Sequence, residues 1–202
     1  MLFRSVLTVV PSAVRAQATT TTTAVEAIRS KLLRLPYYGV FDFLAFSYAN
    51  GVVTLRGFAY RPTLASDAER AVKRVEGVRE VSNQIEVLPV GAFDDDLRWR
   101  VYYTVYRDPF LSRYAPGGGL LWGHRHPFAG GQLRAFGGRF PDSEPAGDYP
   151  IHIVVKDGHV LLLGVVDSDD DRQRAGMLAR TVSGSFTVEN ELTIEPRKKQ
   201  SS

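Results

Sequence analysis

The stretch Asn50-Gly51-Val52-Val53-Thr54-Leu55-Arg56-Gly57 returns 107 residues later (158 − 51 = 107) as Asp157-Gly158-His159-Val160-Leu161-Leu162-Leu163-Gly164. In both copies, a dipeptide that tolerates positive φ is followed by alternating apolar residues and a second glycine. This pattern predicts a β-hairpin with a type I′ turn. Its return strand should bend or approach a neighbouring backbone at Gly57 and Gly164. The chain therefore contains two copies of one structural unit.

The same offset continues on both sides of the hairpin. A helix with an apolar stripe follows each hairpin and ends at Gly77 or Gly184, and a last strand comes after it. An amphipathic helix also precedes each hairpin, marked by Val25, Ile28, Leu32 and Leu35 in the first copy and by Leu97, Val101 and Val105 in the second. We therefore expect an α+β fold of two αββαβ modules, with helices packed on one face of a small three-stranded sheet.

These residues resemble the BON domain family, whose hallmark is a hairpin ending nG-x-V-x-L-x-G followed by v-x-G-V-x-x-V-x-N. The second half of the hallmark is matched by residues 75–83, Val-Glu-Gly-Val-Arg-Glu-Val-Ser-Asn, and by residues 182–190, Val-Ser-Gly-Ser-Phe-Thr-Val-Glu-Asn. The second copy departs at Ser185, where we expect the adjacent Phe186 to substitute for the usual valine. The resemblance implies a periplasmic or cell-envelope protein that binds phospholipid surfaces or other envelope components, sometimes linked to osmotic or envelope stress.

The motif residues are Gly51, Gly57, Gly77, Asn83, Gly158, Gly164, Gly184 and Asn190. We expect the glycines to be structural. The two asparagines are open to two interpretations, a ligand contact or an amide that satisfies buried backbone groups. The second is favoured, because both asparagines share the parity of the apolar residues in their strands.

Around the two modules, the sequence predicts a targeting segment, linkers and a tail. A positive start, an apolar stretch and Ala16-Gln17-Ala18 indicate a cleaved signal peptide and hence export, although a simple N-terminal extension remains an alternative. The predicted boundaries are a signal peptide at 1–18, a flexible linker at 19–23, a first domain at 24–89, a linker at 89–91, a second domain at 94–196 with an insertion at 110–149, and a basic tail at 197–202.

Composition excludes several classes of protein. The formal charge of +3 falls to +1 once Arg4 and Arg15 are removed with residues 1–18 (3 − 2 = 1). A nearly neutral chain does not suit nucleic-acid binding, which requires a concentrated basic face. The absence of cysteine excludes a disulfide scaffold, thiolate zinc sites and a cysteine nucleophile.

No motif for catalysis, a cofactor or a metal is evident. The acidic residues Asp167, Asp169, Asp170 and Asp171 lack the glycine and the distal glutamate of an EF-hand. We therefore interpret them, like Asp94, Asp95 and Asp96, as residues favoured in the first turn of a helix. His124 and His126 lack a third metal ligand nearby, and His152 and His159 are expected to face outward from their strands. The sequence therefore predicts a protein that is not an enzyme.

The insertion is the main candidate contact region, because it combines glycines, aromatic residues and arginines. Such residues suit membrane interfaces and protein contacts, whereas the simpler interpretation is a long, partly disordered loop. The candidate contact residues are Tyr114, Leu120, Leu121, Trp122, Arg125, Phe128, Arg134, Phe136, Arg139 and Phe140.

A second clue comes from the sheet faces that should be open to solvent. They carry Phe41, Phe43 and Ala45 in the first copy, and Val154, Leu161 and Leu163 in the second. Such faces need a cover, most economically the other module, otherwise a partner protein or lipid. We expect a non-enzymatic envelope protein that binds phospholipid surfaces, or alternatively a chaperone-like adaptor for proteins, in an oligomeric state that the sequence leaves open.

Overall fold

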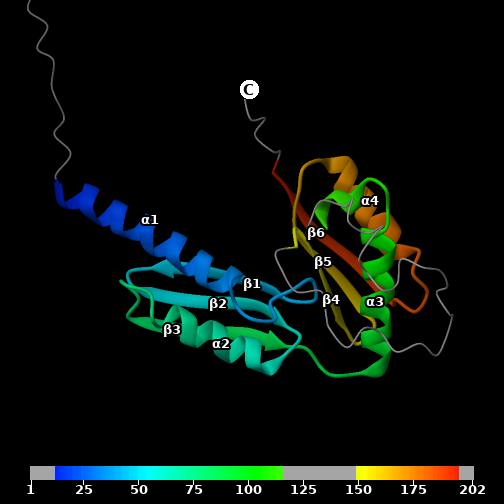
Figure 1. The fold of residues 1–202 in the computed structure, drawn as a ribbon, viewed down its shortest axis with the longest axis horizontal. Helices are drawn as coiled ribbons and strands as arrows, with labels where there is room; N and C mark the ends of the chain where they lie inside the picture. Colours follow the sequence, from blue (N-terminus) through cyan, green and yellow to red (C-terminus); the bar gives the residue numbers. More distant parts are fainter. Residues whose placement is uncertain (1–11, 116–148, 196–202) are drawn as a thin grey trace, which may run out of the picture.

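The computed structural model describes residues 12–115 and 149–195 of the chain, which form two modules side by side (Figure 1). Module 1 contains α1 (Ser12–Leu33), β1 (Phe43–Ala49), β2 (Val52–Ala59), α2 (Pro62–Val72) and β3 (Glu80–Val87). Module 2 contains α3 (Ala92–Tyr106), the 3-10 helix η1 (Leu111–Tyr114), β4 (Ile151–Lys156), β5 (His159–Val166), α4 (Asp169–Arg180) and β6 (Thr187–Ile194). The predicted α+β fold with a repeated αββαβ order is confirmed. None of the described helices has both the length and the apolar character needed to cross a bilayer.

Both modules have the same mixed three-stranded sheet. The first two strands are antiparallel, and the third runs parallel to the second, so the orders are β1-β2-β3 and β4-β5-β6. The hairpin turns match closely, with φ of 51° and 79° at Asn50 and Gly51 and the same two values at Asp157 and Gly158. Positive φ at both central residues is the signature of the predicted type I′ turn.

The second glycine of each hairpin allows a close approach between backbones. Gly57 and Gly164 have φ of 119° and 122°. A Cβ atom at either position would collide with the carbonyl oxygen of Phe43 or Pro150 on the neighbouring strand. The sequence expectation is confirmed, because only glycine combines this backbone conformation with this spacing.

The two motif asparagines join the second helix of each module to its last strand. The side-chain amide of Asn83 donates to the carbonyl of Ala65 (3.0 Å), and its oxygen accepts from the backbone N–H of Ile85 (3.1 Å). Asn190 does the same with Arg172 (2.7 Å) and Leu192 (3.3 Å). Both side chains therefore satisfy backbone groups within their own module, as the structural interpretation expects.

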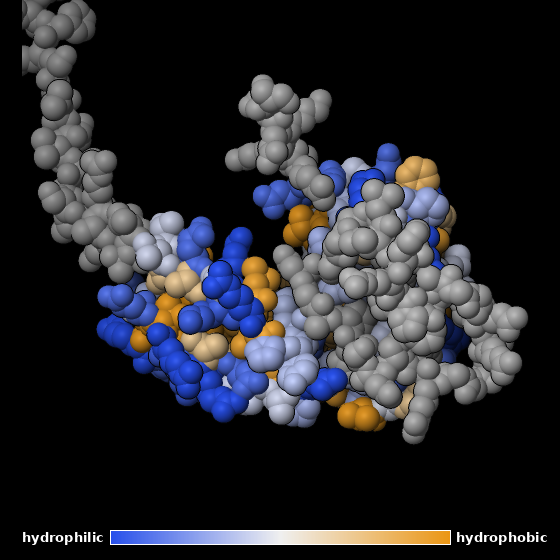
Figure 2. All heavy atoms as spheres, viewed as in Figure 1, coloured by the Kyte–Doolittle hydropathy of each residue, from blue (hydrophilic) through white to orange (hydrophobic). Residues whose placement is uncertain are grey.

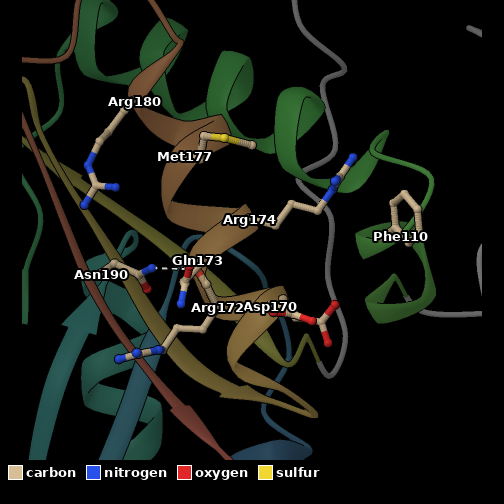
Figure 3. A pocket seen from close by; sticks show the side chains of 9 residues that line it. Phe110, Asp170, Arg172, Gln173, Arg174, Met177, Arg180 and Asn190 are labelled. Atoms are coloured by element: carbon tan, nitrogen blue, oxygen red, sulfur yellow. Dashed lines mark hydrogen bonds between the residues drawn. The ribbon is translucent and has the colours of Figure 1, made fainter.

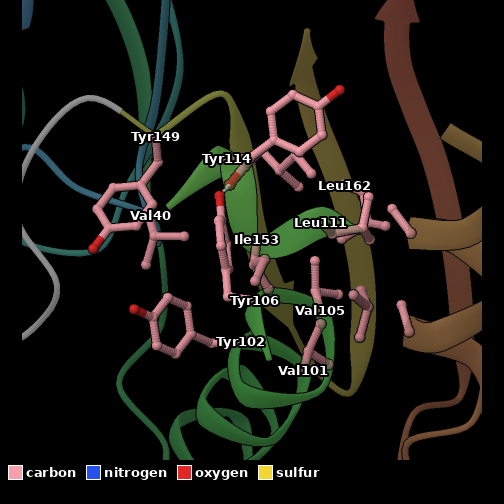
Figure 4. Close-up of a cluster of buried hydrophobic side chains, with 14 of the residues drawn as sticks. Val40, Val101, Tyr102, Val105, Tyr106, Leu111, Tyr114, Tyr149, Ile153 and Leu162 are labelled. Carbon is pink, nitrogen blue, oxygen red and sulfur yellow. Dashed lines mark hydrogen bonds between the residues drawn. The ribbon is translucent and has the colours of Figure 1, made fainter. Parts of the chain in front are cut away.

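The core of module 2 lies between α3 and its sheet (Figure 4). Val101 and Val105 on α3, together with Ile151, Ile153 and Leu162 on the strands, are fully buried. Two polar side chains of α3 complete this packing. The hydroxyl of Tyr106 donates to the carbonyl of Ile151, and the guanidinium of Arg98 donates to that of Val155, both at 2.5 Å.

The modules cover each other's apolar sheet faces. Leu88, Val154 and Leu163 form a buried cluster with Phe43, Phe58 and Leu161. The expectation that the other module covers this face is therefore confirmed for Phe43, Val154, Leu161 and Leu163. Phe41 packs instead against Trp99 and Tyr102 of α3, with ring centroids 5.2 and 6.0 Å apart.

Two sequence expectations were wrong. Residues 19–23, expected to form a flexible linker, belong to α1. The helical cost of threonine is only a fraction of a kcal/mol per residue, and neither glycine nor proline interrupts residues 12–33. His152, expected to face outward, is 6% exposed, and its Nδ1 lies 3.2 Å from the carbonyl oxygen of Gly39. It does point away from the core of module 2, but module 1 covers that face.

Candidate functional site

An exposed group of aromatic side chains lies at the hairpin end of module 2. Phe93 is 50% exposed and Phe186 is 72% exposed. Their rings stack with centroids 6.3 Å apart and an interplanar angle of 28°, and His159 meets Phe186 edge-on at 5.9 Å. We name Phe93, His159 and Phe186 the aromatic tip. At least half of the surface of Phe93 and of Phe186 is open to the solvent.

Hydrogen bonds join the three segments that carry the aromatic tip. The buried carboxylate of Asp94, next to Phe93 on α3, accepts from the backbone N–H groups of Asp157 and Gly158, both at 2.8 Å. The N–H of Phe186 donates to the carbonyl of Gly158 (2.8 Å). The start of α3, the β4–β5 turn and the segment before β6 are thereby fixed to one another.

A cation lies beside these rings. A Cβ atom placed on Gly184 would meet both Arg100 Nη2 (3.3 Å) and Phe93 Cζ (3.5 Å), so the guanidinium and the ring are neighbours. Arg100 donates to the carbonyl of Ser183 (2.7 Å) and pairs with the half-exposed Asp96 (2.5 Å). Aromatic rings beside an arginine suit a membrane interface or a protein contact.

The sequence assigned a different role to Phe186. It was expected to replace the missing valine at position 185, yet its side chain lies over Gly158 as that of Arg79 lies over Gly51 in module 1. The structure therefore corrects that expectation, since Phe186 is the counterpart of Arg79. Ser185 needs no apolar substitute, because its hydroxyl donates to the carbonyl of Val182 (3.1 Å).

A pocket of about 820 Å³ lies along α4 and is the second candidate site (Figure 3). Its lining residues are Phe110, Asp170, Asp171, Arg172, Gln173, Arg174, Met177, Arg180 and Asn190. Met177 is 54% exposed. Arg180 has no ion-pair partner within the described part of the chain. The pocket thus offers both apolar surface and a cation to a ligand.

One wall of this pocket is fixed by an ion pair. Arg174 donates to both carboxylate oxygens of Asp108, at 2.7 and 2.6 Å, and its guanidinium lies 4.5 Å from the ring centroid of Phe110. The hydrogen bond from Arg174 is the main reason why the pKa of Asp108 lies below its usual value, and it raises the pKa of Arg174 in turn. Asp108 also accepts from the N–H groups of Phe110 (3.0 Å) and Leu111 (3.2 Å), where η1 begins.

The structure removes one residue from the predicted contact set. Tyr114 is 3% exposed, donates its hydroxyl hydrogen to Asp171 (2.9 Å) and accepts from the N–H of Asp167 (2.8 Å). It is a core residue, because η1 turns it inward beside Leu111. The remaining candidates fall at positions 116–148, outside the described residues, namely Leu120, Leu121, Trp122, Arg125, Phe128, Arg134, Phe136, Arg139 and Phe140.

The acidic residues in the first turn of α4 have local structural roles. The hydroxyl of Ser168 accepts from the N–H of Asp171 (3.2 Å) and so caps the helix, and Asp171 itself is buried against Arg113. Asp169 pairs with Arg172 (2.5 Å). Within residues 12–115 and 149–195, no group of three or more potential metal ligands comes together. His124 and His126 lie outside those ranges.

Comparisons with known proteins identify the repeated unit. The family model for the BON domain matches residues 20–89 and 137–196. Two similar solved structures both come from CdsD, a structural protein of the type III secretion system of Chlamydia trachomatis. One is its C-terminal domain, with 13% identity over 85% of this chain and 97% of that chain and a TM-score of 0.25. The other has 12% identity over 86% of this chain and 93% of that chain and a TM-score of 0.24. Such low TM-scores support no argument about function, and no curated protein matches the chain.

Proposed function

This chain belongs to the BON domain family, and from that premise we propose that it is a non-enzymatic binding protein of the bacterial cell envelope that associates with phospholipid surfaces. The observation that supports this function most directly is the aromatic tip. Phe93 and Phe186 are large apolar side chains, at least half exposed, at the hairpin end of module 2. Soluble proteins rarely hold such side chains stacked in solvent without a contact to make.

The tip suits the interface of a bilayer better than its interior. Aromatic rings are favoured at the level of the lipid headgroups, where Arg100 could pair with phosphate groups. Burying a phenylalanine side chain is worth about 1.5–3 kcal/mol, so two half-exposed rings would contribute about 2–4 kcal/mol. This magnitude fits weak, reversible association rather than permanent anchoring, and the contribution of Arg100 would make the association sensitive to salt.

The proposed envelope location depends on the predicted signal peptide at residues 1–18. Cleavage after Ala18 would leave Thr19 as the first residue and keep the remainder of α1. Mass spectrometry of the protein recovered from a bacterial periplasm is expected to find Thr19 at the N-terminus. An intact residue 1 in a protein that stays inside the cell would contradict export. A role in envelope stress would follow from this location.

Vesicle co-sedimentation tests the lipid contact. The full chain is mixed with vesicles of phosphatidylglycerol and phosphatidylcholine, or of phosphatidylcholine alone, at low and high salt. We expect salt-sensitive binding to the anionic vesicles, weakened at least about tenfold by Phe93→Ser combined with Phe186→Ser. Met177→Ser is the matched control, since it removes an equally exposed apolar side chain elsewhere. Equal binding by all three proteins would rule out the aromatic tip as the contact.

The insertion and the tail at 197–202 are proposed as additional contacts, because of their aromatic and basic composition. A deletion of residues 116–148, made with and without the two serine substitutions, separates the insertion from the aromatic tip. If the insertion and the aromatic tip both bind lipid, the deletion should weaken binding further in the serine variant. Full binding by the combined variant would exclude the insertion and the aromatic tip and leave the tail as the contact.

A protein-binding adaptor is the second candidate function, and the pocket along α4 favours it. Met177 and Arg180 would contact an apolar residue and an acidic residue of a bound polypeptide. Light scattering of an unfolding model substrate provides the test. Suppression of aggregation that is lost on Met177→Ser and Arg180→Ser, in a protein that binds no vesicles, would favour the adaptor over the membrane protein.

A further inference from the structure

The four outer strands of the two sheets differ in how their edges are protected. Among the strands that the structure describes, these are β1, β3, β4 and β6. Proteins protect such edges with charged residues or by covering them, because the unpaired backbone groups otherwise pair with another chain. β3 contains Glu80 and Glu86, and β6 contains Glu189 and Glu191. β1, Phe-Leu-Ala-Phe-Ser-Tyr-Ala, contains no charged residue at all.

The equivalent strand of module 2 is covered at every second residue. The carbonyl of Ile151 accepts from the Tyr106 hydroxyl, and that of Val155 accepts from Arg98, both at 2.5 Å. Between them, the N–H of Ile153 donates to the carbonyl of Val40 (2.8 Å). These groups point away from β5, so the free edge of β4 is closed by α3 and by a segment of module 1.

The corresponding groups of β1 are open. Leu44, Phe46 and Tyr48 occupy the positions of Ile151, Ile153 and Val155, and they pair with β2 in the same register. Their outward N–H and carbonyl groups have no backbone partner within residues 12–115 and 149–195. A row of evenly spaced donors and acceptors is therefore available to one further strand.

The side chains of this edge are also incompletely covered. No residue of β1 is buried, whereas five of the six residues of β4 are buried. Leu44, Phe46 and Tyr48 contact the core of module 1 but stay half-buried. In Figure 2, apolar surface is visible on module 1 between the hydrophilic groups of its helices. A strand added at this edge would cover apolar side chains as well as satisfy backbone groups.

We propose that β1 pairs with β1 of a second copy of this chain, antiparallel across a two-fold axis at Phe46. In that register Phe46 faces its own counterpart and Leu44 faces Tyr48, so all six outward residues exchange hydrogen bonds. The two sheets become one six-stranded sheet. This inference does not depend on lipid binding, which concerns the opposite module.

The sequence of β1 favours a second copy over an unrelated strand. In a two-fold pairing, each side chain of β1 faces a side chain from β1 of the other copy. Like charges in this strand would therefore face each other at two symmetric places and repel. An uncharged strand avoids this repulsion, and β1 is the outer strand that meets this condition. Backbone pairing with an outer strand also occurs close to this edge, because Val40, three residues before β1, accepts a hydrogen bond from the N–H of Ile153 in β4.

Sedimentation velocity of the full chain between 1 and 200 µM is the direct test. We expect a concentration-dependent monomer–dimer equilibrium. Ala45 and Ser47 face each other across the proposed axis, on the sheet face opposite the helices. Ala45→Lys combined with Ser47→Lys places like charges opposite each other twice and should weaken dimerisation at least about tenfold. Ala45→Glu combined with Ser47→Lys places opposite charges there and should retain the dimer.

The charge-swap variant separates repulsion from misfolding, because both variants alter the same two positions. Ser82→Lys combined with Gln84→Lys, on the other edge of the same sheet, should leave the dimer unchanged. A monomer up to 200 µM overturns the proposal, and a partner strand from another protein then becomes the expected occupant. This register is also overturned if the two-lysine variant dimerises as strongly as the parent chain. The same holds if the two-lysine variant and the charge-swap variant lose the dimer equally.

Discussion

The two modules share one topology and one turn geometry, yet they differ in how well their first strand is covered. In module 2, α3 lies over β4, and five of its six residues are buried. In module 1, no residue of β1 is buried although α1 precedes it in the same order. Two copies of the same backbone pattern have therefore diverged into a well-packed unit and a more open one.

The residues of the two first helices explain this difference. α3 places Trp99, Tyr102 and Tyr106 into a large cluster that also includes Val40 and Phe41 of module 1. α1 contributes Ile28 and Leu32 as buried residues to the smaller cluster of module 1. Large aromatic side chains bury more surface than aliphatic ones. We infer that module 2 contributes most of the stability, while module 1 keeps an edge free for contacts.

The largest expected effect comes from truncating equivalent residues in the two first strands. Ile151 and Leu44 occupy the same position of the repeat, with Ile151 fully buried and Leu44 half-buried. Ile151→Ala should lower the free energy of unfolding by about 3 kcal/mol, and Leu44→Ala by about 1 kcal/mol. Urea denaturation measures both.

A fully buried pair provides the control for this comparison. Leu55 and Leu162 are both 0% exposed at equivalent positions of the second strands. Their alanine variants should lose similar amounts of stability, about 3 kcal/mol each. If Ile151→Ala and Leu44→Ala lower the free energy of unfolding equally, the burial of the first strand does not distinguish the two modules.

The repeat itself could be predicted from the sequence because backbone geometry restricts the residues involved. Gly57 and Gly164 stand where a Cβ atom would collide with the neighbouring strand, and Asn83 and Asn190 bond to backbone groups within their own module. Such local requirements recur at a fixed spacing, so the sequence shows them twice.

Contacts between distant segments could not be predicted in the same way. His152 has the strand parity of an outward residue, and only the docking of module 1 buries it. Tyr114 lies in a stretch whose composition resembles a loop, yet it bonds to Asp171 across 57 residues. The aromatic tip combines Phe93 and Phe186, which lie far apart in the sequence of module 2, and no spacing rule relates these two positions.

Acid should destabilise module 2 through a pair that lies beside its pocket. The pKa of Asp108 is lowered in the folded chain, chiefly by the hydrogen bond from Arg174, from an ordinary value of 3.8. The pair therefore stabilises the folded state above that pH, and this contribution is lost as the pH falls through the lower folded pKa. Because Arg174 is partly exposed, we expect only about 1 kcal/mol. Asp108→Asn should remove this part of the acid dependence, measured as unfolding free energy from pH 6 to pH 2.

Module 1 offers the matched control for the acid experiment. Asp67 and Arg70 form a surface pair on α2, and surface pairs contribute little to stability. Asp67→Asn should leave the profile of stability against pH close to that of the parent chain. A profile for Asp108→Asn that coincides with that of the parent would mean that the pair of Asp108 and Arg174 has no net effect on folding.

The smallest effect on stability, and the sharpest test of the proposed surface, comes from Phe186→Arg. This change gives module 2 the residue that module 1 has at the equivalent position, where Arg79 lies over Gly51 and donates to the carbonyl of Asn50. Phe186 is 72% exposed, so the free energy of unfolding should change by no more than about 0.5 kcal/mol. At high salt, binding to phosphatidylglycerol vesicles should nevertheless weaken, because an apolar contact is replaced by a charge whose attraction to the anionic lipid is screened. If vesicle binding is unchanged while the chain stays folded, the exposed ring is only a substitute for Arg79 at the turn, and the lipid contact lies elsewhere in the molecule.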